Sequence, residues 1–174
     1  MWRCLLAATL GGSLSWALPA AAQQPAPTAA IPSGRANFIL VQTAARPDSV
    51  LAGLRLYLQS NGFVPDTLDP VRGLLTTRVL AEGETLSEQM KIRALRGADG
   101  WRLTGVYLTG GPLNSGFTAF PATFFGLNDT PAKTAFRELE ATARAIPGGT
   151  LRYGRAKVPF GAFTKWEDAL KKPW

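Results

Sequence analysis

A chain of 174 residues with 46% hydrophobic and 18% charged residues has the composition of a globular protein with a core, not of a disordered one. It has no histidine, and its single cysteine is Cys4, so the composition argues against a disulfide framework, a zinc cluster and histidine- or cysteine-based catalysis. The formal charge of +7 favours anionic partners, unless the chain is simply a basic exported protein.

The first 35 residues predict export. Residues 1–22 have the pattern of a secretory signal peptide, with Arg3 at the start, an apolar middle and a small-residue cleavage site at 20–22; a buried N-terminal helix is the alternative. Cys4 precedes the apolar stretch, so we expect an unlipidated product that begins near Gln23 and is periplasmic or secreted. Residues 23–35 are rich in Pro, Ala and Gln and predict an extended linker, which leaves 36–174 as a single domain.

The domain begins with a predicted strand over 38–41 and a predicted helix over 47–63. Pro47 suits the first helical position, and Asn61-Gly62 tolerates the left-handed conformation that ends a helix. Phe63 is then expected to fold back onto the last turn. The apolar stripe of this helix consists of Val50, Leu51, Leu54, Tyr57 and Leu58.

Three antiparallel strands are predicted to follow, over 73–80, 85–96 and 101–109, after a turn-rich segment at 64–70 without a regular pattern. Residues 97–100 form the turn between the last two strands. The alternation of apolar and polar residues along 89–94 predicts a sheet with one dry and one wet face. Gly105 is expected to allow close backbone approach beneath the first helix.

The remaining elements are a glycine- and phenylalanine-rich loop over 110–128, a helix over 131–146, a short strand over 150–153 and a helical turn over 166–170. Asp129 or Thr130 is expected to cap the long helix. The predicted fold is therefore α+β, an antiparallel sheet of about four to five strands with two helices packed on one face.

Residues 50–78 resemble a known group of domains. An apolar helix ends in Asn61-Gly62-Phe63 and is followed by Asp69-Pro70 and Gly73-Leu-Leu-Thr-Thr. This order is similar to the helix-grip or TATA-box-binding-protein-like domains of exported bacterial envelope proteins, among them outer-membrane assembly lipoproteins and families of unknown function. The resemblance implies an α+β fold and an envelope location. It transfers no functional residue, and the lipid-acceptor cysteine of those lipoproteins is missing.

No motif predicts catalysis. The chain has no glycine-rich phosphate loop, no calcium loop and no activated serine, so we expect neither an enzyme nor a cofactor, and no metal site. Glu82, Glu84 and Glu88 are the one carboxylate cluster; a solvated turn is the favoured interpretation over glycosidase-like chemistry.

Two aromatic stretches are candidate contact surfaces. Phe117, Phe120, Phe124 and Phe125 form either a loop tucked over the open end of the sheet or an exposed apolar lip. The C-terminal series Phe160, Phe163, Trp166 and Trp174 is interleaved with Lys157, Lys165, Lys171 and Lys172, as at membrane interfaces or stacking platforms, although docking of 160–166 on the sheet is preferred. The candidate contact residues are Phe117, Phe120, Phe124, Phe125, Trp166, Lys171 and Lys172.

We therefore expect a non-enzymatic exported envelope protein that binds a protein, a peptide or a cell-surface component. One alternative is a carrier of an apolar small molecule or lipid in a cavity between sheet and helices, gated by 110–127. Another is a hydrolase that uses only carboxylates. Candidate partners are an envelope protein, a cell-surface polymer or a membrane surface, whereas an exported protein meets little nucleic acid.

Overall fold

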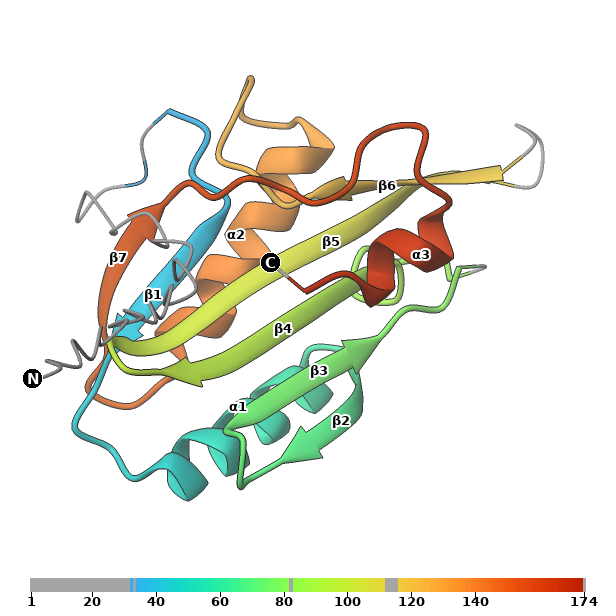
Figure 1. Ribbon diagram of the computed structural model, residues 1–174. Coiled ribbons are helices and arrows are strands. Elements are labelled where there is room, and N and C mark those ends of the chain that lie inside the picture. The colour runs from blue at the N-terminus through green and yellow to red at the C-terminus, as the bar shows by residue number, and fades with distance from the viewer. Residues whose placement is uncertain (1–31, 33, 82, 112–115, 174) are drawn as a thin grey trace, which may run out of the picture.

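The computed structural model describes residues 32, 34–81, 83–111 and 116–173, and in this part the chain forms one antiparallel sheet of seven strands with three helices (Figure 1). The strands follow the order β2-β3-β4-β5-β1-β7, and β6 pairs with the far end of the long strand β5. The α+β prediction is confirmed, with more strands than the four to five expected. The strands are β1 Phe38–Gln42, β2 Val64–Asp69, β3 Leu74–Arg78, β4 Met90–Gly97, β5 Gly100–Gly111, β6 Gly116–Pro121 and β7 Thr150–Gly154.

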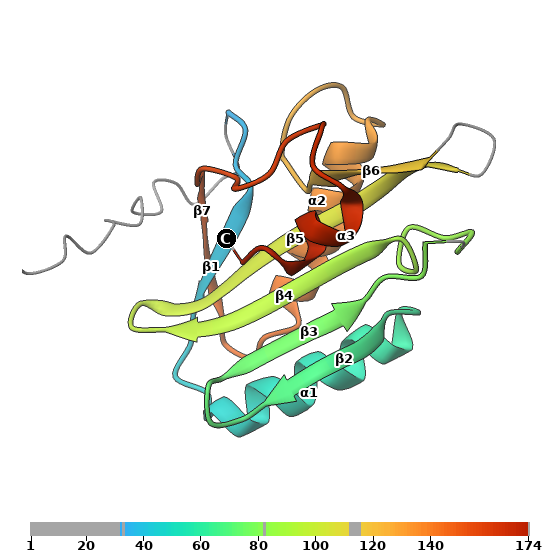
Figure 2. The same ribbon diagram turned by 45° about the vertical axis from the view of Figure 1, so that its right-hand side comes forward.

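The two long helices, α1 (Pro47–Ser60) and α2 (Pro131–Arg144), pack side by side on one face of the sheet. The short helix α3 (Trp166–Lys171) lies on the opposite face, against β6. Figures 1 and 2 show α1 and α2 behind the strands and α3 in front of them. The prediction of two helices on one face is thus confirmed for α1 and α2, and α3 is a third helix on the other face.

The ends of α1 follow from its sequence. Pro47 is the first helical residue, where its missing N–H has no intrahelical partner to lose. At the other end Gly62 adopts φ +80°, a left-handed conformation that glycine reaches without steric cost. The chain then reverses, so the Phe63 N–H donates to the Leu58 carbonyl at 2.9 Å and the Phe63 ring is buried. A short helix with these ends is stable because its apolar stripe is covered by the sheet.

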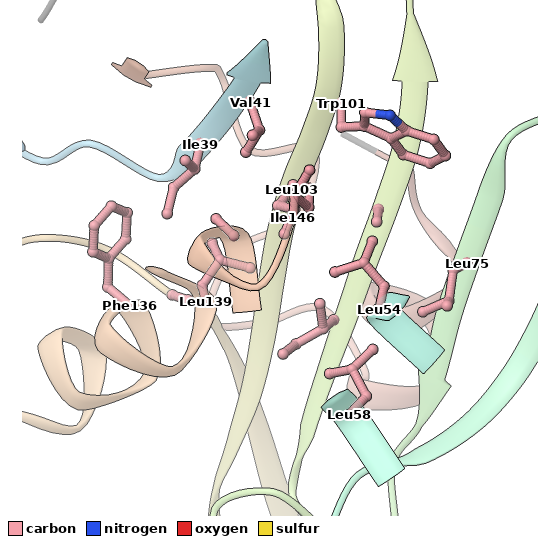
Figure 3. Packing of buried hydrophobic residues seen from close by; sticks show 14 of the residues in the cluster. Ile39, Val41, Leu54, Leu58, Leu75, Trp101, Leu103, Phe136, Leu139 and Ile146 are labelled. Atoms are coloured by element: carbon pink, nitrogen blue, oxygen red, sulfur yellow. The ribbon is translucent and has the colours of Figure 1, made fainter. Parts of the chain in front are cut away.

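The core fills the layer between the sheet and the two long helices (Figure 3). Leu54 and Leu58 of α1, and Phe136 and Leu139 of α2, have no exposed surface. Gly105 of β5 lies beneath this layer, where an added Cβ would come within 2.6 Å of Met90 Cε, 3.1 Å of Ala122 Cβ and 3.7 Å of Leu139 Cδ1. Gly105 is closely packed, but the nearest atoms are the side chains of Met90 and Ala122 and not backbone, and the helix in contact with it is α2 and not α1.

Two segments form strands that were not predicted, because neither sequence shows the alternation of apolar and polar residues that marks a strand. Residues 64–69 form the edge strand β2, not a turn-rich connection; most of this strand is exposed, and its register shifts between Pro65 and Thr67. Residues 116–121 form β6, which was expected to be loop. Gly116 and Pro121 bound this strand, and both residue types ordinarily signal loops.

The strand expected over 85–96 begins at Met90. Residues 85–89 are held in a turn because the Glu88 carboxylate accepts hydrogen bonds from the Glu84 N–H (3.0 Å), the Thr85 N–H (2.9 Å) and the Thr85 hydroxyl (2.8 Å). The threonine and leucine of this segment have strand propensity, but a side chain that satisfies local backbone donors overrides it.

Candidate functional site

The face of the sheet opposite α1 and α2 carries two rows of side chains whose composition is unlike a core. The strand registers align Phe38, Thr104, Arg93 and Thr76 in one row across β1, β5, β4 and β3. The next row contains Arg152, Leu40, Arg102 and Leu95 across β7, β1, β5 and β4. We call Arg93, Arg102 and Arg152, together with Phe38 and Leu40 between them, the arginine face.

Arg102 occupies the middle of this face. Its guanidinium carbon lies 4.1 Å from the centroid of the Phe38 ring, a cation–π distance, and Phe38 itself is buried. The Arg102 Nε is buried and has no hydrogen-bond partner. A guanidinium that has lost part of its hydration without gaining an acceptor is destabilised.

Arg93 is the diagonal neighbour of Arg102 on β4, a position about 7 to 8 Å away in an antiparallel pair. Burial lowers the pKa of Arg93, and the nearby Arg72 lowers it further. Burial likewise lowers the pKa of Arg102, with a smaller contribution from Arg93. These arginines stay protonated at neutral pH, so both directions report mainly partial burial of the guanidinium groups and, to a smaller extent, neighbouring positive charge; no ion pair among the described residues offsets either.

The acidic residues near this face lie at its β2 edge. Asp66 Oδ2 is 3.5 Å from the Thr76 hydroxyl, and Asp69 Oδ1 accepts a hydrogen bond from the Arg72 N–H at 3.0 Å. In the described residues, ion pairs form between Glu140 and Arg144 and between Asp168 and Lys171, and none involves the arginine face.

Helix α3 borders the arginine face and covers the neighbouring part of the sheet. Ala169 packs with Val106, Leu108 and Ala119 in a small second core. The Lys91 ammonium donates to the Leu170 carbonyl at 3.2 Å, at the end of the helix where the dipole favours a cation. Lys91 is therefore engaged in holding α3, whereas Arg93, Arg102 and Arg152 are not engaged by it.

The four phenylalanines expected to form one surface lie in different places. Phe117 packs edge-on against Trp166, with ring centroids 6.1 Å apart. Phe120 contacts the Tyr107 ring at 6.0 Å, and Phe124 the Phe136 ring at 5.8 Å, so both line the main core.

Phe125 is 53% exposed and has the Arg35 guanidinium 4.4 Å from its ring centroid. The basic residues predicted in the C-terminal tail are exposed: Lys171 pairs with Asp168 at 3.4 Å, and the Lys172 ammonium donates to the Pro159 carbonyl at 3.3 Å.

Of the predicted carboxylate cluster, Glu84 and Glu88 lie in one turn, where the Glu84 N–H donates to the Glu88 carboxylate at 3.0 Å. Glu82 lies outside the described residues, and Glu88 is occupied with the turn's own donors, which lower the pKa of its carboxyl. Across the described part of the chain, no group of three or more carboxylates or other ligating side chains is placed to hold a metal ion. No helix within the described ranges has the length and hydropathy needed to cross a bilayer.

Sequence reasoning missed the arginine face, although a signal for it exists. Lys91 and Arg93 mark the wet side of β4, and Arg102 alternates with Trp101 and Leu103 on β5. Recognising that these positions share one face requires the register between β4 and β5, which alternation alone does not supply. Comparison with known proteins adds nothing to these residues: no family model matches the chain, and no curated protein is significantly similar to it.

Proposed function

We propose that this chain is an exported, non-enzymatic binding protein that recognises an anionic polymer of the cell surface through its arginine face. The observation that carries the proposal is the set of three arginines on one sheet face that have no carboxylate partner among the described residues. The signal-peptide pattern and the linker support export.

The spacing of the arginines favours a polymer over a small ion. Arg93 on β4 and Arg152 on β7 are separated by β5 and β1, which is three strand spacings or about 14 Å. A small anion contacts one or two of these guanidinium groups, whereas a chain with repeating charges contacts all three. Leu40 and Phe38 between the arginines are buried, so contact with such a chain falls to the guanidinium groups.

The alternative of an apolar carrier is less well supported. It requires an open volume between the sheet and α1 and α2, but the middle of this layer is occupied by side chains with no exposed surface, such as Leu54 and Leu139 (Figure 3). The apolar hollow of about 470 Å³ that is present lies at the edge of the layer, between α1 and β2.

The test compares two doubly substituted proteins of equal charge. Arg93→Gln with Arg102→Gln removes two cations from the arginine face, and Arg55→Gln with Arg137→Gln removes two from the exposed surfaces of α1 and α2. Binding of fluorescently labelled polyphosphate and of poly-glutamate is measured by anisotropy at 50 mM and 200 mM salt, with neutral dextran as the negative control. Circular dichroism checks that both variants fold.

We expect the wild-type protein to bind the acidic polymers and to bind less tightly at the higher salt concentration. The arginine-face variant should lose about tenfold or more in affinity, because each charge-assisted hydrogen bond contributes about 1.5 to 3 kcal/mol. The helix-side variant should stay within about twofold of wild type, as expected for mutations far from the contact. An equal loss in both variants refutes a specific face. If the protein binds anionic lipid vesicles more tightly than it binds the polymers, its partner is a membrane surface and not a polymer.

A further inference from the structure

A second basic site lies at the end of the sheet where β1 begins and β7 ends. Arg35, Asn37, Thr123 and residues 155–158 meet there around a cleft of about 540 Å³. This volume is within the range of small-molecule sites, about 300 to 1,000 Å³. The segments come from three separate parts of the chain, so the cleft is a product of the fold and not of a local sequence pattern.

Three cations line the cleft: Arg35, Arg155 and Lys157. No carboxylate is among the residues that line it, and none of the three cations forms an ion pair within the described ranges. Asn37, Thr123 and Val158 complete the lining with polar and aliphatic surface. Converging positive charge in a concave site favours an anion more strongly than the same charges on a flat surface do.

Hydrogen bonds from the Asn37 side chain and between backbone groups hold the walls of the cleft in place. The Asn37 amide brackets Ala156, donating to its carbonyl at 2.9 Å and accepting from its N–H at 2.8 Å. The Arg35 N–H donates to the Phe124 carbonyl at 3.2 Å, and the Phe124 N–H donates to the Ala36 carbonyl at 2.8 Å. The segments before β1, after β6 and after β7 are thereby tied together, so a ligand does not have to order them on binding.

Arg35 itself has an unusual backbone. Its φ is +67°, the left-handed region that non-glycine residues seldom adopt. In this conformation the guanidinium lies over the half-exposed Phe125 ring at 4.4 Å. A guanidinium stacked on one ring presents its second planar surface to another flat group.

We propose that this cleft binds a small molecule that carries a phosphate or carboxylate group beside a ring, with Arg155 and Lys157 contacting the anion and Arg35 stacking on the ring. The anion alone does not account for a cleft of this volume, and the Arg35–Phe125 stack and Val158 supply the surface that a ring requires. This inference is independent of the arginine face, since the two sites share no residue.

The experiment titrates the full chain with three probes of the same ring size: phenyl phosphate, benzoate and benzyl alcohol. Chemical shifts of backbone amides are followed by ¹⁵N NMR, and affinities are measured by calorimetry. We expect the two anions to shift the amides of Asn37, Thr123 and Ala156, and benzyl alcohol to bind at least tenfold more weakly. The ratio between phenyl phosphate and benzoate then identifies which anion the cleft prefers.

Two variants test the roles of the cations. Arg155→Gln with Lys157→Gln should weaken phenyl phosphate at least tenfold, whereas Arg55→Gln with Arg137→Gln, which removes two exposed cations from α1 and α2, should leave it unchanged. Arg35→Gly keeps a residue suited to φ +67°, so the domain stays folded, and it should reduce binding of phenyl phosphate more than that of inorganic phosphate. The proposal is overturned by any of three results. These are chemical-shift changes spread evenly over the basic surface, an affinity for benzyl alcohol equal to that for the two anions, or equal effects of both double variants.

Discussion

The hydroxyl of Tyr153 provides a test of the packing between β7 and α2. It donates to Glu140 Oε1 at 2.7 Å, and the residue is 3% exposed. Burial, followed by the hydrogen bond and the charge of Glu140, raises the pKa of Tyr153 to about 12. The substitution Tyr153→Phe removes the hydroxyl and its titration but keeps the ring.

The sign and size of the effect follow from the two pKa values. Because the pKa of Tyr153 is higher in the folded state than the value of about 10 in the unfolded chain, its contribution is fully present below pH 10 and is lost as the pH rises to about 12. At pH 11 the folded state holds the proton and the unfolded state has mostly released it, which costs the wild type about 1.4 kcal/mol relative to neutral pH. The Phe variant does not pay this cost.

We therefore expect Tyr153→Phe to be less stable than wild type by about 1 kcal/mol at pH 8, the value of one hydrogen bond, and as stable or slightly more stable at pH 11. Urea unfolding followed by tryptophan fluorescence measures both differences. The pKa values of Tyr57 and Tyr107 are also raised, but these residues are present in both proteins and cancel. Glu140→Gln should weaken the pH dependence. A stability difference that is the same at pH 8 and pH 11 contradicts the hydrogen bond and the elevated pKa.

Four further predictions concern single residues. Gly105→Val should destabilise by about 1 to 3 kcal/mol because the added atoms overlap the side chains of Met90 and Ala122. Gly53→Ala, on α1 with open space at its Cβ, should stabilise by about 0.5 to 1 kcal/mol; urea unfolding checks both. Thr77→Val should cost about 1 to 3 kcal/mol in the same assay, because the buried Ile92 N–H loses the hydroxyl that accepts it at 2.8 Å. Asn37→Ala should expose the segment after β7 to trypsin, and unchanged cleavage rates would show that the amide bracket is dispensable.

An element was predictable from the sequence where the residues at its ends and the spacing of its apolar residues indicate the same boundaries. In α1 the proline at the start, the stripe of leucines and Gly62 all indicate the same helix, and the structure has it over Pro47–Ser60. In α2 the stripe containing Phe136 and Leu139 is buried as expected. The expected side-chain cap of α2 is absent: Thr130 is the N-cap residue, but its hydroxyl donates to the Phe125 and Leu127 carbonyls of the preceding loop.

The candidate site was not predictable because its residues come together only through the register between β4 and β5 and the pairing of β7 with β1. Arg93 and Arg102 are nine residues apart across a hairpin, and Arg152 reaches the same face only because β7 pairs with β1. The strongest local signal, the run of phenylalanines at 117–125, instead marks core packing at Phe120 and Phe124. A cluster of aromatic residues is conspicuous in a sequence whether it is buried or exposed, so it does not discriminate a contact surface from a core.

The two faces of the sheet differ in what they contribute to stability. On the helix face, removing a side chain such as Leu139 leaves a cavity and lowers the free energy of unfolding. On the arginine face, the positive charges of Arg93 and Arg102 repel one another, and Arg102 has a buried donor without an acceptor. Replacing both arginines should therefore leave the free energy of unfolding unchanged or raise it. Functional groups are commonly held at a cost to stability. If replacing Arg93 and Arg102 abolishes binding without lowering stability, the two arginines serve the ligand and not the fold.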